Sequence, residues 1–170
     1  DQLPAIGPGS VLKDLLRSGV FPCVRLTQIF RQNNRGTIVL NAHAINTGCM
    51  PTFTEDDFSF VPAVSAEEAA KQILSICQSL IATGHSVMDM QVLSPMRREA
   101  CGVDAFNRTL QEALNPQTED NKSIAGFRSG DKVMQIRNDY TKNVFNGDVG
   151  RIVWIDTEKL IVQYTDDVDV

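Results

Sequence analysis

The chain has 170 residues, of which 42% are hydrophobic, and its formal net charge is −5. This length allows one ordinary domain, or a domain with a small appendage, and the apolar content is sufficient for a buried core. The negative net charge argues against a protein that binds nucleic acid through bulk electrostatics, because such binding normally requires a basic surface. The cationic residues are nevertheless concentrated, since residues 91–151 carry a balance of +1 and the rest of the chain carries −6.

The cysteines and the apolar runs indicate a reducing compartment. The cysteines are widely spaced and form no C-x-x-C pair, so we expect buried thiols rather than a disulfide framework or a zinc site. No apolar run approaches the length of a membrane span and no signal-peptide pattern opens the chain, so we expect a cytoplasmic protein with no membrane partner. The four cysteines are Cys23, Cys49, Cys77 and Cys101.

The first part of the chain predicts a helix, a strand and a second helix. The first helix follows Ser10, a favourable N-cap residue, and ends at Gly19. A β-prone stretch from Cys23 to Phe30 comes next. The second helix is predicted to end at Gly48 and to bury one apolar face, made of Ile38, Ala42 and Ile45.

The middle of the chain predicts strands that alternate with helices. Residues 58–61 and 88–93 are short β-prone runs. The helix after 58–61 has a capping box of Ser65 and Glu68, and the helix after 88–93 is stopped by Asn115 and Pro116. Such alternation is typical of a parallel sheet with helices on its faces. The residues expected to face inward are Ile73, Ile76, Cys77 and Leu80 in the first of these helices, and Val103, Phe106, Leu110, Ala113 and Leu114 in the second.

The last part of the chain predicts a small antiparallel sheet or barrel. Short β-prone runs occupy 132–136, 149–155 and 160–164, and Asn146-Gly147 is a strong tight-turn signal. Trp154 lies in the second of these runs and is expected in the core. The polar stretch 117–123 is the predicted boundary between the two kinds of structure.

Several blocks of the sequence resemble motifs of superfamily-one DNA helicases in the RecD-like branch, and they follow the order of that family. Residues 1–9 resemble the third helicase motif, and residues 26–32 resemble the fourth. Residues 91–98 are similar to a strand and loop of the second RecA-like domain. Residues 131–140 and 145–150 resemble the Src-homology-three-like barrel inserted in that domain.

The resemblance implies an α/β fold, in which a partial RecA-like parallel sheet with flanking helices is followed by a small antiparallel Src-homology-three-like β-barrel. Residues 1–22 would be the motif III loop and connecting helix of the first RecA-like domain. Residues 23–123 would belong to the second RecA-like domain, and residues 124–170 would form the inserted barrel. Because the chain begins with Asp1 inside a motif and not with Met, we expect it to be part of a longer protein.

The same resemblance implies a nucleotide site that is shared with the first RecA-like domain. Arg31 would pair with the γ-phosphate of ATP as charge develops, and Gln2 would couple the nucleotide to DNA. From the residues alone, a solvated arginine and an exposed terminal glutamine are the alternatives. The chain contains no G-x-x-x-x-G-K-[ST] loop, so ATP and Mg²⁺ would be bound mainly by residues outside it. We therefore expect no ATP hydrolysis by the chain alone.

The resemblance further implies that single-stranded DNA is a partner, held in two places. The loop 94–98 would grip phosphates at the start of the next helix, whose free N–H groups favour anions. A hairpin in the barrel mixes cations, amides and an aromatic ring, which suits stacking on a base. Solvated arginines and an ordinary exposed hairpin remain open as alternatives. The candidate DNA-binding residues are Ser94, Arg97, Arg98, Asn107, Arg137, Asn138, Tyr140 and Asn146, with Lys142 beside them.

The implied function is that of an ATP-dependent DNA helicase, similar to the exodeoxyribonuclease V alpha subunit or to stand-alone RecD-like enzymes. Such a motor would move 5′ to 3′ on one strand and unwind duplexes in DNA repair and recombination, either by itself or with other subunits of a nuclease complex. Two alternatives remain. The chain could belong to the helicase portion of a conjugative relaxase, or it could be a non-catalytic module that binds protein.

Overall fold

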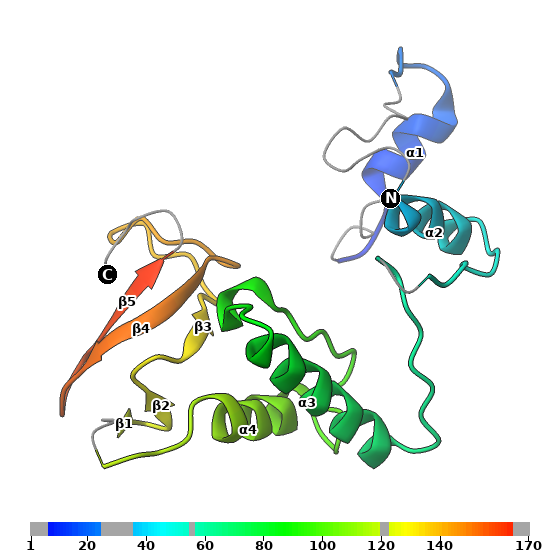
Figure 1. Cartoon of the computed structure of the whole chain (residues 1–170). Helices are drawn as coiled ribbons and strands as arrows, with labels where there is room; N and C mark the ends of the chain where they lie inside the picture. The colour runs from blue at the N-terminus through cyan, green and yellow to red at the C-terminus, as the bar shows by residue number, and fades with distance from the viewer. Residues whose placement is uncertain (1–6, 25–35, 55–56, 120–122, 165–170) are drawn as a thin grey trace. The chain divides into compact units, whose positions relative to one another are not determined.

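The computed structural model describes residues 7–24, 36–54, 57–119 and 123–164 of the chain. The chain divides into two compact units, Asp1–Val61 and Pro62–Val170. Among the described residues, Figure 1 shows helices in the first unit, and helices with small antiparallel sheets in the second.

The first unit contains α1 (Val11–Ser18) and α2 (Thr37–Asn46). Ser10 is the N-cap residue of α1 as predicted, although its hydroxyl makes no capping hydrogen bond. Gly19 ends α1 in the left-handed conformation, with φ 65°. The four apolar residues of α1 are all exposed: Val11, Leu12, Leu15 and Leu16.

The buried face of α2 differs from the predicted one. Val39 and Asn41 are buried, whereas Ile38, Ala42 and Ile45 are exposed. The side chain of Asn41 explains this, because its Nδ2 donates to the Thr52 carbonyl (2.6 Å) and its Oδ1 accepts from the Thr52 N–H (2.7 Å). These two bonds fasten the chain after α2 to the Asn41 side of the helix.

The start of α2 is capped from a distant part of the first unit. Asp57 Oδ2 accepts a hydrogen bond from the Thr37 N–H (2.8 Å), a position where a carboxylate is favourable. Desolvation raises the pKa of Asp57, but hydrogen bonds from Thr37 and Thr54 outweigh it and lower the pKa below its ordinary value. The strand predicted for residues 58–61 is absent, because this described stretch has no regular structure. The strand predicted for 23–30 falls mostly outside the described residues.

The second unit begins with α3 (Ala66–Ala82), which lies beside α4 (Val103–Leu114) in Figure 1. Ser65 Oγ accepts from the Glu68 N–H (3.1 Å), as the capping box predicts. The Glu68 carboxylate, however, accepts from the N–H of Val64 (2.9 Å) and not from that of Ser65. Cys77 is the buried residue of α3, and Phe106 is the buried residue of α4.

The strand predicted for residues 88–93 is wrong. The chain instead forms a short 3₁₀ helix, η1 (Val87–Asp89), which is capped by Ser86, and then continues without regular structure. The carbonyl groups of Val87, Met88 and Met90 accept hydrogen bonds from Lys132 Nζ and are thereby taken from any neighbouring strand. Every strand pair among the described residues is antiparallel, so the predicted RecA-like parallel sheet is not seen there.

The predicted antiparallel sheet is confirmed. It comprises β3 (Lys132–Met134), β4 (Val149–Ile155) and β5 (Leu160–Tyr164) in the order β3-β4-β5. A two-stranded hairpin of β1 (Ser123–Ile124) and β2 (Phe127–Arg128) precedes it, which the sequence did not predict. The core consists of Val144, Ile152, Ile155, Val162 and Tyr164, with Ile124, Val133 and Leu160 packed against it.

Trp154 was predicted in the core but is 40% exposed. The reason is a β-bulge, because Ile152 pairs with Val162 while Trp154 pairs with the adjacent Ile161. The extra residue shifts the alternation of the strand, so that Ile152 and Ile155 point inward and Trp154 does not. On the outer side, the ring of Trp154 lies 5.9 Å from Lys159 Nζ.

Ile152 is 1% exposed and lies in this core, so shortening it should destabilise the second unit. We expect Ile152→Ala to lower the free energy of unfolding by about 2–5 kcal/mol and Ile152→Val by about 1 kcal/mol, because the larger deletion leaves a larger cavity. Urea unfolding followed by the fluorescence of Trp154, the single tryptophan, measures both. Equal and small effects of the two substitutions would contradict this assignment of the core.

Candidate nucleic-acid interface

The two residues predicted to act on the nucleotide, Arg31 and Gln2, lie outside the described residues. Their roles therefore stay predictions. The other candidate residues all lie in the second unit, in the loop before α4, on α4 itself and in the hairpin between β3 and β4.

Ser94 braces the 94–98 loop from within. Its Oγ accepts a hydrogen bond from the Met96 N–H (3.1 Å) and donates to the Cys101 carbonyl (2.6 Å). The hydroxyl thus ties the start of the loop to the residues that lead into α4. Its proton is engaged inside the protein, which makes Ser94 a support of the loop and a poor donor to phosphate.

The amides at the start of α4, which were predicted to favour an anion, already have partners within the chain. The Val103 N–H donates to the Met96 carbonyl (3.0 Å) and the Asp104 N–H donates to the Arg97 carbonyl (3.1 Å), while the next two N–H groups bond to Gly102. Of the four amides that a helix normally leaves free, those of Val103 and Asp104 are occupied by the loop, that of Gly102 donates to the Glu99 carbonyl (3.0 Å), and that of Ala105 bonds to Gly102. Gly102 permits this fit, because a Cβ at that position would clash with the carbonyl groups of Arg97 and Arg98.

The arginine side chains of the loop remain available to a ligand. Arg97 is 85% exposed in its side chain, and its Nε lies 3.6 Å from Asp104 Oδ2. An ion pair this exposed contributes little and can be exchanged for a phosphate. Arg98 is also exposed, and Asn107 is exposed further along α4. Phosphate binding here would depend on guanidinium groups and not on helix amides.

The hairpin between β3 and β4 is closed by its own backbone. Asp139 and Val144 exchange two hydrogen bonds (2.8 and 3.1 Å), and Asp139 Oδ1 accepts from the N–H groups of Thr141 and Lys142 (3.0 and 3.2 Å). Asn143 takes the left-handed conformation, with φ 56°, at the turn. Val144 is 2% exposed and anchors the hairpin in the core.

Asn138 brings three of the predicted residues together. Its Nδ2 lies 3.1 Å from Tyr140 Oη, and its Oδ1 accepts from the Asn146 N–H (2.9 Å). The Tyr140 ring meets the edge of Phe145 at a centroid distance of 6.0 Å. Tyr140 is nevertheless 78% exposed, so its ring is oriented by neighbours but open to solvent. Arg137 and Lys142 are exposed in the same hairpin.

Sequence reasoning missed the side chains that support this hairpin. Gln135 Nε2 donates to the Arg137 carbonyl (2.7 Å), and Gln135 Oε1 accepts from Tyr164 Oη in the core (3.1 Å). Asp148 Oδ2 accepts from the Phe145 N–H (2.7 Å). An aspartate directly after Asn146-Gly147 was the available signal, since Asp side chains commonly bond to nearby backbone in turns.

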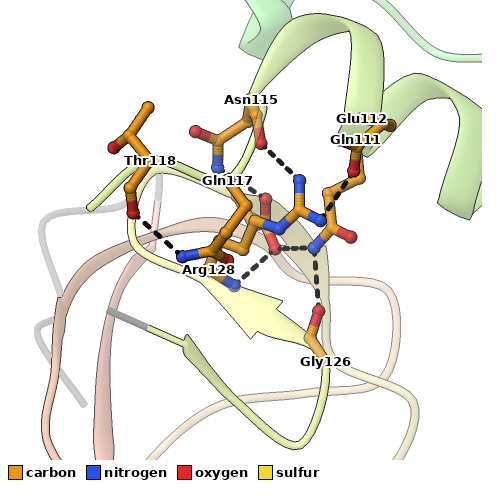
Figure 2. A network of polar contacts seen from close by, with 8 residues as sticks. Gln111, Glu112, Asn115, Gln117, Thr118, Gly126 and Arg128 are labelled. Carbon is orange, nitrogen blue, oxygen red and sulfur yellow. Dashed lines mark hydrogen bonds and ion pairs between the residues drawn. The ribbon is translucent and has the colours of Figure 1, made fainter. Parts of the chain in front are cut away.

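Sequence reasoning also missed a polar network between the end of α4 and the barrel (Figure 2). Asp131, which is 9% exposed, accepts hydrogen bonds from Gln111 Nε2 (2.6 Å), Asn115 Nδ2 (2.7 Å) and the Arg128 N–H (2.8 Å). The Arg128 side chain then donates to the Asn115 carbonyl (2.8 Å) and pairs with Glu112 Oε2 (2.7 Å). No periodicity marks these residues, because each is polar and those at the end of α4 are well separated in sequence from Arg128 and Asp131.

The part of the chain that the structure describes holds no group of three or more His, Cys, Asp or Glu residues placed to bind a metal ion. Among the same residues, no helix is long and apolar enough to cross a membrane.

Comparison with known proteins identifies the family. A family model described as the SH3 domain of ATP-dependent RecD-like DNA helicases matches residues 106–164. The ATP-dependent RecD2 DNA helicase of Deinococcus radiodurans is 30% identical over 165 residues, which is 96% of this chain. Both matches support a fragment of a RecD-like DNA helicase. The chain spans 22% of the length of that relative.

The family match confirms both the resemblance to RecD-like helicases and the small SH3-like barrel. The match begins at residue 106, inside α4, so the family pattern includes the part of the helix that bonds to Asp131. The DNA-binding roles of individual residues and the proposed domain boundaries in this RecD-like chain stay predictions.

If Ser94 braces the loop, Ser94→Ala should loosen it. We expect the amide hydrogen of Met96 to exchange roughly tenfold faster, because losing one hydrogen bond costs about 1.4 kcal/mol locally. Residue-resolved hydrogen exchange measured by NMR tests this. Ser75→Ala, at an exposed position of α3, is the matched control and should leave Met96 unchanged. Unaltered protection of Met96 in the Ser94 variant would contradict the bracing role.

Proposed function

We propose that this chain is part of an ATP-dependent DNA helicase and that its second unit holds single-stranded DNA. The observation that carries the proposal is the Tyr140 ring, which is 78% exposed yet oriented by Asn138 and Phe145. An exposed ring that is already oriented loses little conformational freedom when a base stacks on it. Membership of the RecD-like helicase family supports DNA as the ligand.

The charges near this ring support a nucleic-acid ligand. Arg137 and Lys142 are exposed in the same hairpin and could follow the phosphate backbone while the Tyr140 ring contacts a base. Stacking is tolerant of sequence, because every base offers a flat face. The hairpin would therefore hold a moving strand without reading it, as a motor requires.

The loop before α4 would supply a second grip. Arg97 and Arg98 present exposed guanidinium groups from a loop that Ser94 and the α4 amides hold in place. Guanidinium groups bind phosphate oxygens through paired hydrogen bonds. Asn107, which lies on α4, would also bind phosphate.

The nucleotide chemistry would be completed by the first RecA-like domain of the longer protein. In that setting Arg31 stabilises charge on the γ-phosphate of ATP, Gln2 couples the nucleotide to DNA, and Mg²⁺ is held mainly by residues outside this chain. Movement would be 5′ to 3′, in the cytoplasm and in the service of DNA repair and recombination, alone or within a nuclease complex. The chain by itself would not hydrolyse ATP.

The phosphate grip predicts a salt-dependent affinity that the two arginines of the loop control. Replacing Arg97 and Arg98 together by Ala should weaken binding to oligothymidylate and reduce the slope of log K against log salt by about 1.4, since each phosphate contact on a single strand contributes about 0.7. Fluorescence anisotropy over a series of salt concentrations measures both quantities.

The control for this double substitution is Arg17→Ala, which removes a positive charge from exposed α1 in the first unit. It should leave the slope unchanged. A slope that is the same in the double variant and in the unaltered chain would refute the phosphate grip of the loop.

The stacking role predicts different outcomes for two substitutions of Tyr140. Tyr140→Ala should weaken single-strand binding by roughly tenfold, because stacking on one base contributes about 1–3 kcal/mol. Tyr140→Phe keeps the ring and loses only the hydroxyl, so it should retain most of the affinity. Titration of both variants with the same oligothymidylate provides the measurement, and equal losses in the two would rule out stacking.

A further inference from the structure

The residue before β3 and the first residue of β3 bond to two separate parts of the second unit. Asp131 bonds to the end of α4, and Lys132 bonds to the turn that precedes the 94–98 loop. Neither residue belongs to the DNA-contacting regions described above. Their contacts nevertheless bear on how those regions are placed.

The contact of Asp131 with α4 is specific. The buried carboxylate receives the side-chain amides of Gln111 (2.6 Å) and Asn115 (2.7 Å), the first in the last turn of α4 and the second at its C-cap. A buried carboxylate must keep such donors, because an unpartnered charge in the interior is very costly. Arg128 adds a second connection through the Asn115 carbonyl (2.8 Å) and Glu112 (2.7 Å). The end of α4 is therefore fixed to the barrel.

The contact of Lys132 is equally defined. An ammonium group has three N–H donors, and here the carbonyl groups of Val87 (3.4 Å), Met88 (3.3 Å) and Met90 accept from it. Burial lowers the pKa of Lys132 below its ordinary value, while the charge of Asp89 acts in the opposite direction. The chain at Met90 is therefore held to the barrel immediately before the 94–98 loop.

The segment between these two contacts contains both the 94–98 loop and α4. It starts at Met90, held by Lys132, and ends at Asn115, held by Asp131. With both ends fixed to neighbouring residues at the start of the sheet, Asp131 and Lys132, the segment cannot turn independently of the barrel. The barrel also carries the Tyr140 hairpin, through Val144 in the core and through the bond between Tyr164 and Gln135.

We propose that Asp131 and Lys132 are positioning residues that make the 94–98 loop and the Tyr140 hairpin one rigid body, so that both grip the same DNA strand at once. This inference rests on the proposed function. A strand that is bound at one region then meets the second region at a high effective concentration, and its affinity exceeds that of either contact alone. A strand of only a few nucleotides reaches one region alone, so the gain in affinity should appear only with a longer strand.

In the first experiment, the affinity of the full chain is measured for a long and for a short single strand of DNA. Lys132→Met and Asp131→Asn should each weaken binding of an oligothymidylate of about 20 nucleotides by roughly tenfold, and leave one of about 4 nucleotides, which reaches a single region, within roughly twofold. Lys159→Met is the matched control, because it also removes a lysine charge from an exposed position of the barrel. It should alter neither affinity.

Equal losses for the long and the short strand would show general damage to the fold and overturn the proposal. Unchanged binding of the long strand by both variants would overturn it as well. Fluorescence of Trp154 during urea unfolding identifies any variant whose barrel no longer folds, and in that case the second variant decides the outcome.

A second experiment, without DNA, tests the rigid body independently of the proposed function. Residual dipolar couplings measured by NMR should fit α4 and the β3-β4-β5 sheet to one alignment tensor in the unaltered chain, and to two different tensors when Asp131 and Lys132 are both replaced. If α4 and the sheet share one alignment tensor but the chain does not bind single-stranded DNA, the proposed function is refuted and the rigid body is supported. Two tensors in the unaltered chain would refute the rigid body itself.

Discussion

The buried carboxylate of Asp131 is the interaction on which the second unit depends. Besides the Arg128 N–H, the carboxylate relies on the side-chain amides of Gln111 and Asn115, which lie in the last turn of α4 and at its C-cap. Its backbone is also bonded to the core strand, because the Asp131 carbonyl accepts from the Ile152 N–H (2.9 Å). Separating α4 from the barrel would leave the Asp131 carboxylate without the amide donors of Gln111 and Asn115. This cost in free energy holds the helix and the barrel together. The family match begins within α4, which agrees with a barrel that includes this helix as a structural part.

The sequence predicted elements whose signals are local. The β-prone runs of β4 and β5, the capping serine of α3 and the glycine that ends α1 each depend on a few neighbouring residues, and the structure confirms them. Predictions failed where a distant group decided the outcome. Residues 88–93 are apolar enough for a strand, but Lys132 takes three of the carbonyl groups of Val87–Met90. Trp154 turned outward because a one-residue bulge reversed the alternation, and no feature of the pattern marks that bulge.

In the candidate site, too, the residues with local signals were predicted, and those whose placement depends on distant contacts were not. Tyr140, Asn138 and Asn146 were predicted from composition around one turn, and a single hairpin brings them together. The amides at the start of α4 were expected to bind phosphate, yet the carbonyl groups of Met96 and Arg97 already occupy two of them. That occupation depends on the path of the loop, which Gly102 allows and which sequence spacing does not reveal. The supporting residues Gln135, Asp131 and Lys132 escaped notice because polar side chains that bond to distant backbone leave no periodic signal.

The net charge of −5 explains why rigid placement matters for a chain of this composition. A strongly basic protein holds a nucleic acid through its overall field, and small errors in the position of each contact then matter little. Here the overall field opposes a phosphate backbone, so the proposed binding would come from a few cations and one ring set at fixed distances. A short contact such as a stacked base or a paired guanidinium contributes only when its partner arrives in the correct geometry. The hydrogen bonds of Asp131 and Lys132 would supply that geometry, by joining Arg97 and Arg98 to the body that carries Tyr140.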